Sequence, residues 1–170
     1  MNIEATICRL RALEPEDLEL MYGWENDMQI WRVSGTVAPF SRHVLSRLIE
    51  EQQFDIYATR QMRLVIEHDG QAVGAVDLFE FDPHNRRAGV GIIVDSQHRA
   101  QGLGHDALKA LEQYARQTLH LHQLWCSITV DNEASLKLFR KAGYVECGLR
   151  REWILTSDGA LDEILMQKIL

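Results

Sequence analysis

The segment from Val94 to Gly104 carries the residue types best suited to hold an anion. It reads VDSQHRAQGLG and passes from an apolar, strand-like run into a helical pattern. The backbone N–H groups of residues 101–104 lie at the start of this helix, where they lack helical partners and meet the positive end of the helix dipole. Two glycines permit close approach, and Arg99 adds a fixed positive charge. These features favour a pyrophosphate site, although a tight strand-to-helix turn accounts for the same spacing.

A second segment extends this pattern. Residues 130–135 read VDNEAS, and residues 138–144 read LFRKAGY. Together with the Arg99-x-x-Gly102-x-Gly104 motif after the run Ile92–Val94, these residues resemble the two cofactor motifs of the GNAT N-acetyltransferase superfamily. The resemblance covers nearly the whole chain. The branch it resembles most holds bacterial spermidine (diamine) acetyltransferases and ribosomal-protein N-terminal acetyltransferases, and residues 65–80 and 84–88 are similar to the spermidine enzymes in particular.

The resemblance implies acetyl-CoA as the cosubstrate. The amides of residues 101–104, with Arg99, would hold the pyrophosphate, and the strand edge at residues 92–94 would pair with the pantetheine arm. Asn132 would hydrogen-bond this arm, although an asparagine there also caps a helix. The cofactor-binding residues implied in this way are Ile92, Ile93, Val94, Arg99, Ala100, Gln101, Gly102, Leu103, Gly104, Asn132 and Phe139.

Phe139 is a departure from the family pattern. Many members place a tyrosine four residues before the glycine of the second motif, where it protonates the departing thiolate, and phenylalanine carries no such proton. The proton must then come from water, Cys126, Ser127 or another tyrosine, or the thiolate leaves unaided. A catalytically silent acyl-CoA-binding sensor is the alternative that this position leaves open.

The general base is a second departure, because many relatives carry a glutamate where Gly89 stands. The remaining catalytic candidates are Asp77 and Glu80, acting through water, and Glu80 matches the spermidine enzymes better. Their separation of three places them on opposite faces of a regular strand, so only one faces the site unless a bulge intervenes. A solvated strand carboxylate is an equally good interpretation of either residue.

The expected acceptor is a primary amine, with a small polyamine or diamine such as spermidine first and a protein N-terminal amine second. We expect residues 25–32 and the final hairpin to wall its pocket. Glu25 and Glu152 would attract the amine, and Trp31 would bind its cation through the ring face. Each of these residues could instead belong to ordinary core or surface.

Charge and length narrow the function classes. The 170 residues include 18 Lys and Arg against 25 Asp and Glu, a net charge of −7. This surface disfavours nucleic acid and suits amines, although solubility alone accounts for it. One domain over residues 1–170 fits this length. We expect a cytoplasmic protein without a membrane partner, because the sequence has neither a signal-peptide pattern nor ~20 consecutive apolar residues.

No metal site is expected. Cys8, Cys126 and Cys147 are widely spaced and form no CxxC pair. The His120-x-His122 pair with Cys126 is better explained by a helix exit followed by a strand than by metal ligation.

Hydrophobic periodicity and turn residues supply the elements that position these groups. Strands are predicted at residues 6–13, 63–68, 72–82, 88–95, 123–130, 144–155 and 160–169, and helices at 15–26, after 41, at 103–118 and at 133–142. The Asp69-Gly70 pair predicts a hairpin turn. The order predicts an α+β fold of the GNAT type, a mixed, mostly antiparallel sheet flanked by helices. Assembly into a homodimer or higher homo-oligomer through the terminal strands, common among relatives, is also expected.

Overall fold

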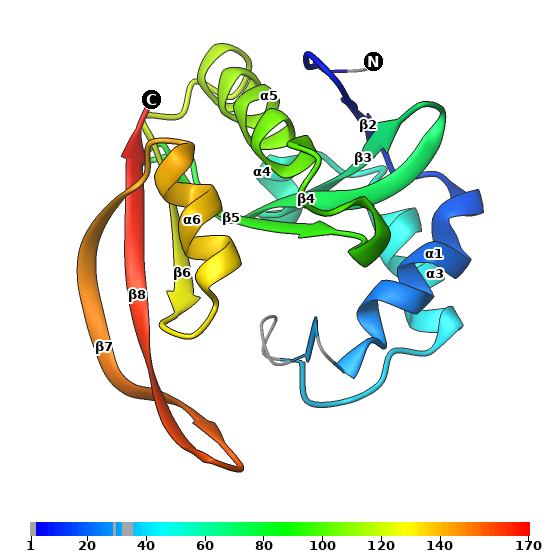
Figure 1. The fold of residues 1–170 in the computed structure, drawn as a ribbon. Helices are drawn as coiled ribbons and strands as arrows, with labels where there is room; N and C mark the ends of the chain where they lie inside the picture. Colours follow the sequence, from blue (N-terminus) through cyan, green and yellow to red (C-terminus); the bar gives the residue numbers. More distant parts are fainter. Residues whose placement is uncertain (1–2, 29, 32–35) are drawn as a thin grey trace.

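The computed structural model describes residues 3–28, 30–31 and 36–170, and Figure 1 shows their fold. The described residues form one eight-stranded sheet in the order β1-β2-β3-β4-β5-β6-β8-β7. Its strands are β1 (Ile3–Glu4), β2 (Arg9–Ala12), β3 (Met62–His68), β4 (Gln71–Asp82), β5 (Arg87–Val94), β6 (Gln123–Thr129), β7 (Val145–Thr156) and β8 (Gly159–Ile169). The α-helices are α1 (Leu18–Glu25), α3 (Arg42–Glu51), α4 (Ile56–Thr59), α5 (Leu103–Gln117) and α6 (Glu133–Lys141). Neighbouring strands are antiparallel except β5 and β6, which confirms the predicted mixed sheet.

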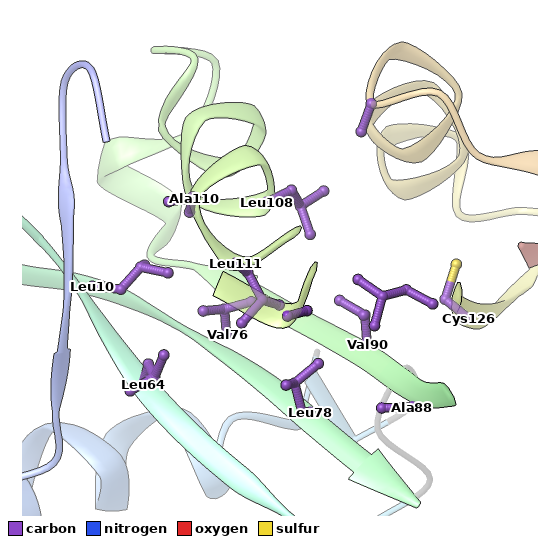
Figure 2. Packing of buried hydrophobic residues seen from close by; sticks show 14 of the residues in the cluster. Leu10, Leu64, Val76, Leu78, Ala88, Val90, Leu108, Ala110, Leu111 and Cys126 are labelled. Atoms are coloured by element: carbon purple, nitrogen blue, oxygen red, sulfur yellow. The ribbon is translucent and has the colours of Figure 1, made fainter. Parts of the chain in front are cut away.

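The sheet separates two apolar layers. On one face, α5 and α6 cover a large buried cluster that includes Leu78, Val90, Leu111 and Cys126. Figure 2 shows Leu111 of α5 lying between this helix and the strands below it, close to Val76. On the other face, α1 and α3 pack through a smaller cluster of Leu13, Met21, Leu45 and Val65. Side chains alternate between these faces along each regular strand, so a strand residue's face decides which layer it serves.

The predicted hairpin between β3 and β4 is confirmed, with Asp69 and Gly70 in the left-handed region at φ of 49° and 76°. The pairing then shifts between Ile66 and Glu67, where β4 carries one extra residue. A second shift lies near Glu80, between the Phe79–Gly89 and Asp82–Arg87 pairs. These bulges decide which side chains of β4 face α1 and α3.

Two predicted elements at the N-terminal end were wrong in part. The strand predicted over residues 6–13 is confined to β2, because the chain reverses before it, with Ala5 N–H donating to Cys8 O at 3.1 Å. The helix predicted over residues 15–26 begins as a 3-10 turn at Pro15–Asp17 before α1. Helix α4 was not predicted. Four residues are too short to show helical periodicity, and Asp55 stabilises α4 by capping its N-terminus.

The sheet divides where β5 meets β6. Their pairing covers only residues 87–89 and 123–125, and it ends at Gly89 opposite Trp125. Beyond this junction β5 continues along β4 to Val94, while β6 continues along β8 to Thr129. Figure 1 shows the two halves of the sheet turned away from each other beyond the junction. The edge of β5 from Val90 to Val94 is therefore not paired with β6.

Candidate active site

The open edge of β5 presents backbone hydrogen-bonding groups. Asp95 N–H donates to Val73 O at 2.9 Å, and this bond shows which alternate residues of β5 are hydrogen-bonded to β4. Because antiparallel pairing alternates between the two edges of a strand, the N–H and C=O groups of Val90, Ile92 and Val94 point away from β4. At about 3.3 Å per residue, this edge is about 13 Å long. An extended amide-containing chain can add to it as a further strand would.

Helix α5 begins close to the end of this edge. Gly102 occupies its N-cap position with φ of 85°, a left-handed conformation that favours glycine. No described side chain caps this helix end. The first helical bond runs from Asp106 N–H to Gly102 O at 3.1 Å, so the amides of residues 103–105 lack helical partners. A 15-residue helix with an uncapped N-terminus is suited to a phosphate group.

The predicted phosphate-loop residues come together here. Arg99 Nε donates to Val94 O at 3.0 Å and so ties the loop to the last residue of β5. Ala100 and Gln101 are exposed, whereas the Leu103 side chain is 1% exposed and can offer a ligand only its backbone. A Cβ at Gly104 would lie 3.3 Å from Leu138 Cδ2 and 3.5 Å from Val94 Cγ2, so glycine lets α5 start close to β5 and α6.

A contact that sequence reasoning missed holds α5 to the N-terminal turn. Asp106 Oδ2 accepts from the backbone N–H groups of Ile7 at 2.7 Å and Cys8 at 3.2 Å. Burial raises the pKa of Asp106, but these two amides, together with the backbone N–H and the side-chain hydroxyl of Thr6, outweigh it, so that the pKa is lowered overall. The chain reversal before β2 therefore serves to anchor the helix that begins at Gly102.

Helix α6 covers the same region from the C-terminal side. Asn132 Oδ1 accepts from Ser135 N–H at 3.2 Å, which confirms the predicted N-cap. Phe139 is 3% exposed and packs edge-on against Tyr144, with ring centroids 4.9 Å apart. A contact of either Asn132 or Phe139 with the cofactor stays a prediction.

Two alternative proton donors near Phe139 are poor acids. Burial, with a smaller effect from Cys147, raises the pKa of Cys126 to about 12. Burial also raises the pKa of Tyr144, with Glu112 and Cys126 adding to the effect. An ordinary thiol has a pKa of about 8.5, so the departing thiolate is a weaker base than the anion of Cys126 or Tyr144. Transfer of a proton from either group to the thiolate is therefore unfavourable. Water, Ser127, a tyrosine other than Tyr144, and departure without protonation stay as alternatives for the leaving thiolate.

A cavity of about 250 Å³ lies on the α1 and α3 face of the sheet, beside β4. Its charged lining residues are Glu25, Arg63 and Asp77. Its other lining residues are mostly apolar: Leu13, Met21, Phe40, Leu48, Gln52, Gln61, Met62, Leu78 and Phe79. Asp77 pairs with Gly91 of β5, and a Cβ at Gly91 would lie 3.6 Å from Asp77 Oδ2. The Asp77 carboxylate therefore lies next to the open part of β5.

Arg63 was missed by sequence reasoning, yet it organises the carboxylates. Its Nε and Nη2 donate to the two oxygens of Asp77 at 2.7 and 3.0 Å, and its Nη1 donates to Glu25 Oε1. Burial lowers the pKa of Arg63, but Asp77 and Glu25 outweigh it and raise the pKa above its ordinary value. The three groups carry a net charge of −1 and leave Asp77 bound to a permanent cation.

Glu80 lies apart from this cluster. It sits in the bulge of β4 with φ of 47°, is exposed, and is not among the residues that line the cavity. The sequence analysis allowed Asp77 and Glu80 to face the same site only if a bulge lies between them, and β4 does contain a bulge at Glu80. The bulge leaves Phe79 on the cavity face, whereas Phe81 joins the larger core cluster on the other face of the sheet. The structure thus brings Asp77, but not Glu80, to the cavity.

Of the residues expected to contact the acceptor, one lines the cavity and another does not. Glu25 lines the cavity, and Trp31 Nε1 donates to Glu25 O at 2.6 Å. Glu152 is exposed in a bulge of β7 with φ of 49°, where its N–H donates to Asp162 Oδ1 at 2.7 Å. Residues 29 and 32, part of the segment 25–32 expected to wall the pocket, lie outside the described residues. Glu152 does not line the cavity.

The described residues include no group of three or more His, Cys, Asp or Glu side chains that could hold a metal ion. None of the helices among them has the length and apolar character that crossing a membrane requires.

The sequence and the fold are similar to those of known acetyltransferases. Residues 8–145 match the acetyltransferase (GNAT) domain family. The spermidine N(1)-acetyltransferase of Escherichia coli K12 is 31% identical over 149 residues, covering 86% of this chain and 78% of that protein. The spermidine N-acetyltransferase from Vibrio cholerae, solved with CoA and spermine, superposes with a TM-score of 0.85 at 25% identity over 94% of both chains. Another structure of that enzyme is dodecameric.

A ribosomal-protein α-N-acetyltransferase in complex with coenzyme A gives a TM-score of 0.86 at 18% identity, over all of this chain and 98% of that one. This second similarity concerns the fold. The chain therefore belongs to the GNAT acetyltransferase family. It is an acetyl-CoA-dependent N-acetyltransferase, and the uncapped start of α5 and the open edge of β5 fit the pyrophosphate and the amide-containing arm of CoA.

Proposed function

We propose that the acceptor is a polyamine or diamine such as spermidine, with the acetyl group transferred directly to a primary amine. The observation that carries the proposal is the cavity on the α1 and α3 face, where Glu25 and Asp77 flank Arg63 beside the open part of β5. Its net negative charge suits a cation. The relationship to spermidine N(1)-acetyltransferase at 31% identity supports the same class of acceptor.

Acetyl-CoA supplies the activated thioester, and the chain supplies position and charge. Residues 90–94 would hold the arm along their open edge, and the start of α5, with Arg99 and the loop residues 100–104, would hold the pyrophosphate. The N–H groups of Val90 and Ile92 point to the open edge, where they can stabilise negative charge on the thioester oxygen. An oriented backbone donor of this kind contributes about 10²–10³-fold in rate.

The amine must reach the thioester uncharged, although an alkylammonium has a pKa of about 10.4. A carboxylate acting through water removes the proton. Asp77 has the right position but is bound to Arg63, whereas Glu80 is exposed and reaches the cavity only through solvent. We propose Glu80 as the base and Asp77 as the residue that orients Arg63 and Glu25. Trp31 and Glu152 are proposed to contact the outer part of a long amine.

The test is thiol release from acetyl-CoA with spermidine, spermine, putrescine, amino sugars and short N-terminal peptides. Selective turnover of the polyamines would support the proposal. Selective turnover of the peptides would replace it with an N-terminal acetyltransferase, for which the solved ribosomal-protein enzyme offers a similar fold. Binding of CoA in a calorimeter without turnover of any acceptor would contradict the polyamine proposal and favour an acyl-CoA-binding sensor.

Self-association is a further part of the proposal. Strand β7 lies at the edge of the sheet, and the side chains of Val145, Leu149, Trp153 and Leu155 on it are more than half exposed. An exposed apolar edge strand is a common pairing surface between copies. We propose a homo-oligomer built through β7, and light scattering at several protein concentrations will show whether the mass exceeds 19.6 kDa.

A further inference from the structure

The reactive end of the cofactor must lie at the closed end of the β5 edge. The pyrophosphate site at the start of α5 follows Val94, so an arm laid along the edge runs from Val94 back toward Val90. At Gly89 the edge closes, because β6 pairs there through Trp125. Any group carried at the end of the arm therefore meets the side chains that surround Gly89. This placement rests on the proposed orientation of CoA, not on the identity of the amine.

Phe79 covers the cavity face of β5 at this closed end. It pairs with Gly89 across β4 and β5. A Cβ built on Gly89 would collide with Cδ2, Cε2 and Cζ of the Phe79 ring, and one built on Gly91 would lie 3.9 Å from its Cε1. The ring thus lies against the backbone from Gly89 to Gly91, in space that a side chain on β5 would otherwise fill.

Trp125 of β6 packs against the Phe79 ring. The Phe79 and Trp125 rings meet edge to face, with centroids 5.3 Å apart. An aromatic pair in this geometry contributes beyond its buried area, and two rings packed on each other have little freedom to move aside. Three strands therefore contribute to one barrier, with Phe79 from β4, Gly89 from β5 and Trp125 from β6.

We propose that Phe79, supported by Trp125, limits the acyl group to acetyl. A two-carbon group ends beside Val90, whereas each added methylene would have to displace the Phe79 ring from Gly89. One methylene that does not fit a rigid pocket costs a factor of about 10–200 in specificity. The protein should accordingly discriminate against propionyl-CoA and, more strongly, against butyryl-CoA.

The primary test is calorimetric binding of CoA, acetyl-CoA and butyryl-CoA without any amine. We expect the wild type to bind butyryl-CoA at least tenfold more weakly than acetyl-CoA. Phe79→Ala should reduce this ratio at least tenfold by opening the end of the channel. Phe79→Leu should give an intermediate ratio, and it preserves the test if the alanine variant fails to fold. With an active acceptor, kcat/KM should fall in the order acetyl-CoA, propionyl-CoA, butyryl-CoA.

Phe81→Leu is the matched control, because Phe81 lies two residues along the same strand but belongs to the larger core cluster and packs against Tyr57 of α4. It should lower stability without changing the ratio of dissociation constants. The inference is overturned if the wild type binds butyryl-CoA as tightly as acetyl-CoA, if folded Phe79 variants keep the wild-type ratio, or if Phe81→Leu changes the ratio equally. Because binding needs no amine, failure of the polyamine proposal would leave this result intact.

Discussion

Arg63 and Asp77 meet across β3 and β4 through two hydrogen bonds, from Nε to Oδ1 at 2.7 Å and from Nη2 to Oδ2 at 3.0 Å. The side chains are 25% and 24% exposed, so the pair is only partly screened by water. Both oxygens of Asp77 are thereby engaged, although the residue lies beside the open part of β5. The two hydrogen bonds fix the Arg63 guanidinium beside Asp77 in the lining of the cavity.

The first prediction concerns Asp77→Asn. Weakening a charge-assisted pair should lower the free energy of unfolding by about 1.5–3 kcal/mol, measured by urea denaturation. The value of kcat should stay within tenfold of the wild type and keep its pH dependence. A loss of 100-fold or more, with a changed pH profile, would instead identify Asp77 as the general base.

Glu80→Gln tests the proposed base. Removing the carboxylate should lower kcat/KM for the amine more at neutral than at alkaline pH, because an amine that is already neutral needs no base. The measurement is a pH–rate profile of thiol release. Glu16→Gln, at an exposed glutamate that does not line the cavity, is a control for a general charge effect. A decrease that is the same at every pH would exclude the role of Glu80 as base.

Phe139→Tyr tests the missing acid. Burial raises the pKa of both Cys126 and Tyr144, so a tyrosine hydroxyl at position 139 would add a proton donor at the position where the resemblance to the family implies the acid. We expect kcat, measured by steady-state thiol release, to rise at least tenfold, a smaller gain than the ~10²–10⁴-fold that a well-placed acid typically contributes. An unchanged kcat in a folded variant would mean that departure of the thiolate does not limit the rate or that the site lies elsewhere.

Gly89→Glu would restore the residue common among relatives, but the Phe79 ring occupies the space. Overpacking should lower the free energy of unfolding by about 1–3 kcal/mol. The double variant Gly89→Glu with Phe79→Ala should recover part of this loss, which a double-mutant cycle of urea midpoints will measure. Strictly additive effects would show that the two residues do not compete for one space.

Asp106→Asn has a pH-dependent effect on stability. The pKa of Asp106 is lowered in the fold, so its carboxylate stabilises the protein above the unfolded pKa of about 3.9 and loses this effect as pH falls through the folded pKa. The variant should be less stable by roughly 1–2 kcal/mol at pH 7. The difference in the free energy of unfolding between the wild type and the variant, measured by urea denaturation, should shrink below about pH 4. A difference that is constant with pH would contradict this linkage.

The sequence by itself determined most of the local elements and indicated where the cofactor would bind. Helix α5 was predicted from Leu103 because the glycine pair and the periodicity after it act within one turn of chain. The hairpin at Asp69-Gly70 and the helix after Asn132 follow in the same way from turn and cap residues. The motifs around Arg99 and Asn132 therefore indicated the family and its cosubstrate.

Only the tertiary structure decided the acceptor end. Counting back from the Asp69-Gly70 turn without a bulge would pair Arg63 with Val76, whereas the bulge in β4 shifts the register by one and places Arg63 opposite Asp77. The bulge at Glu80 likewise separates Phe79 from Phe81. An extra residue in a strand leaves no periodic signal, yet it moves every later side chain to the other face. The partners of Asp77 and the position of Phe79 over Gly89 arise from packing between distant segments, which composition and spacing do not encode.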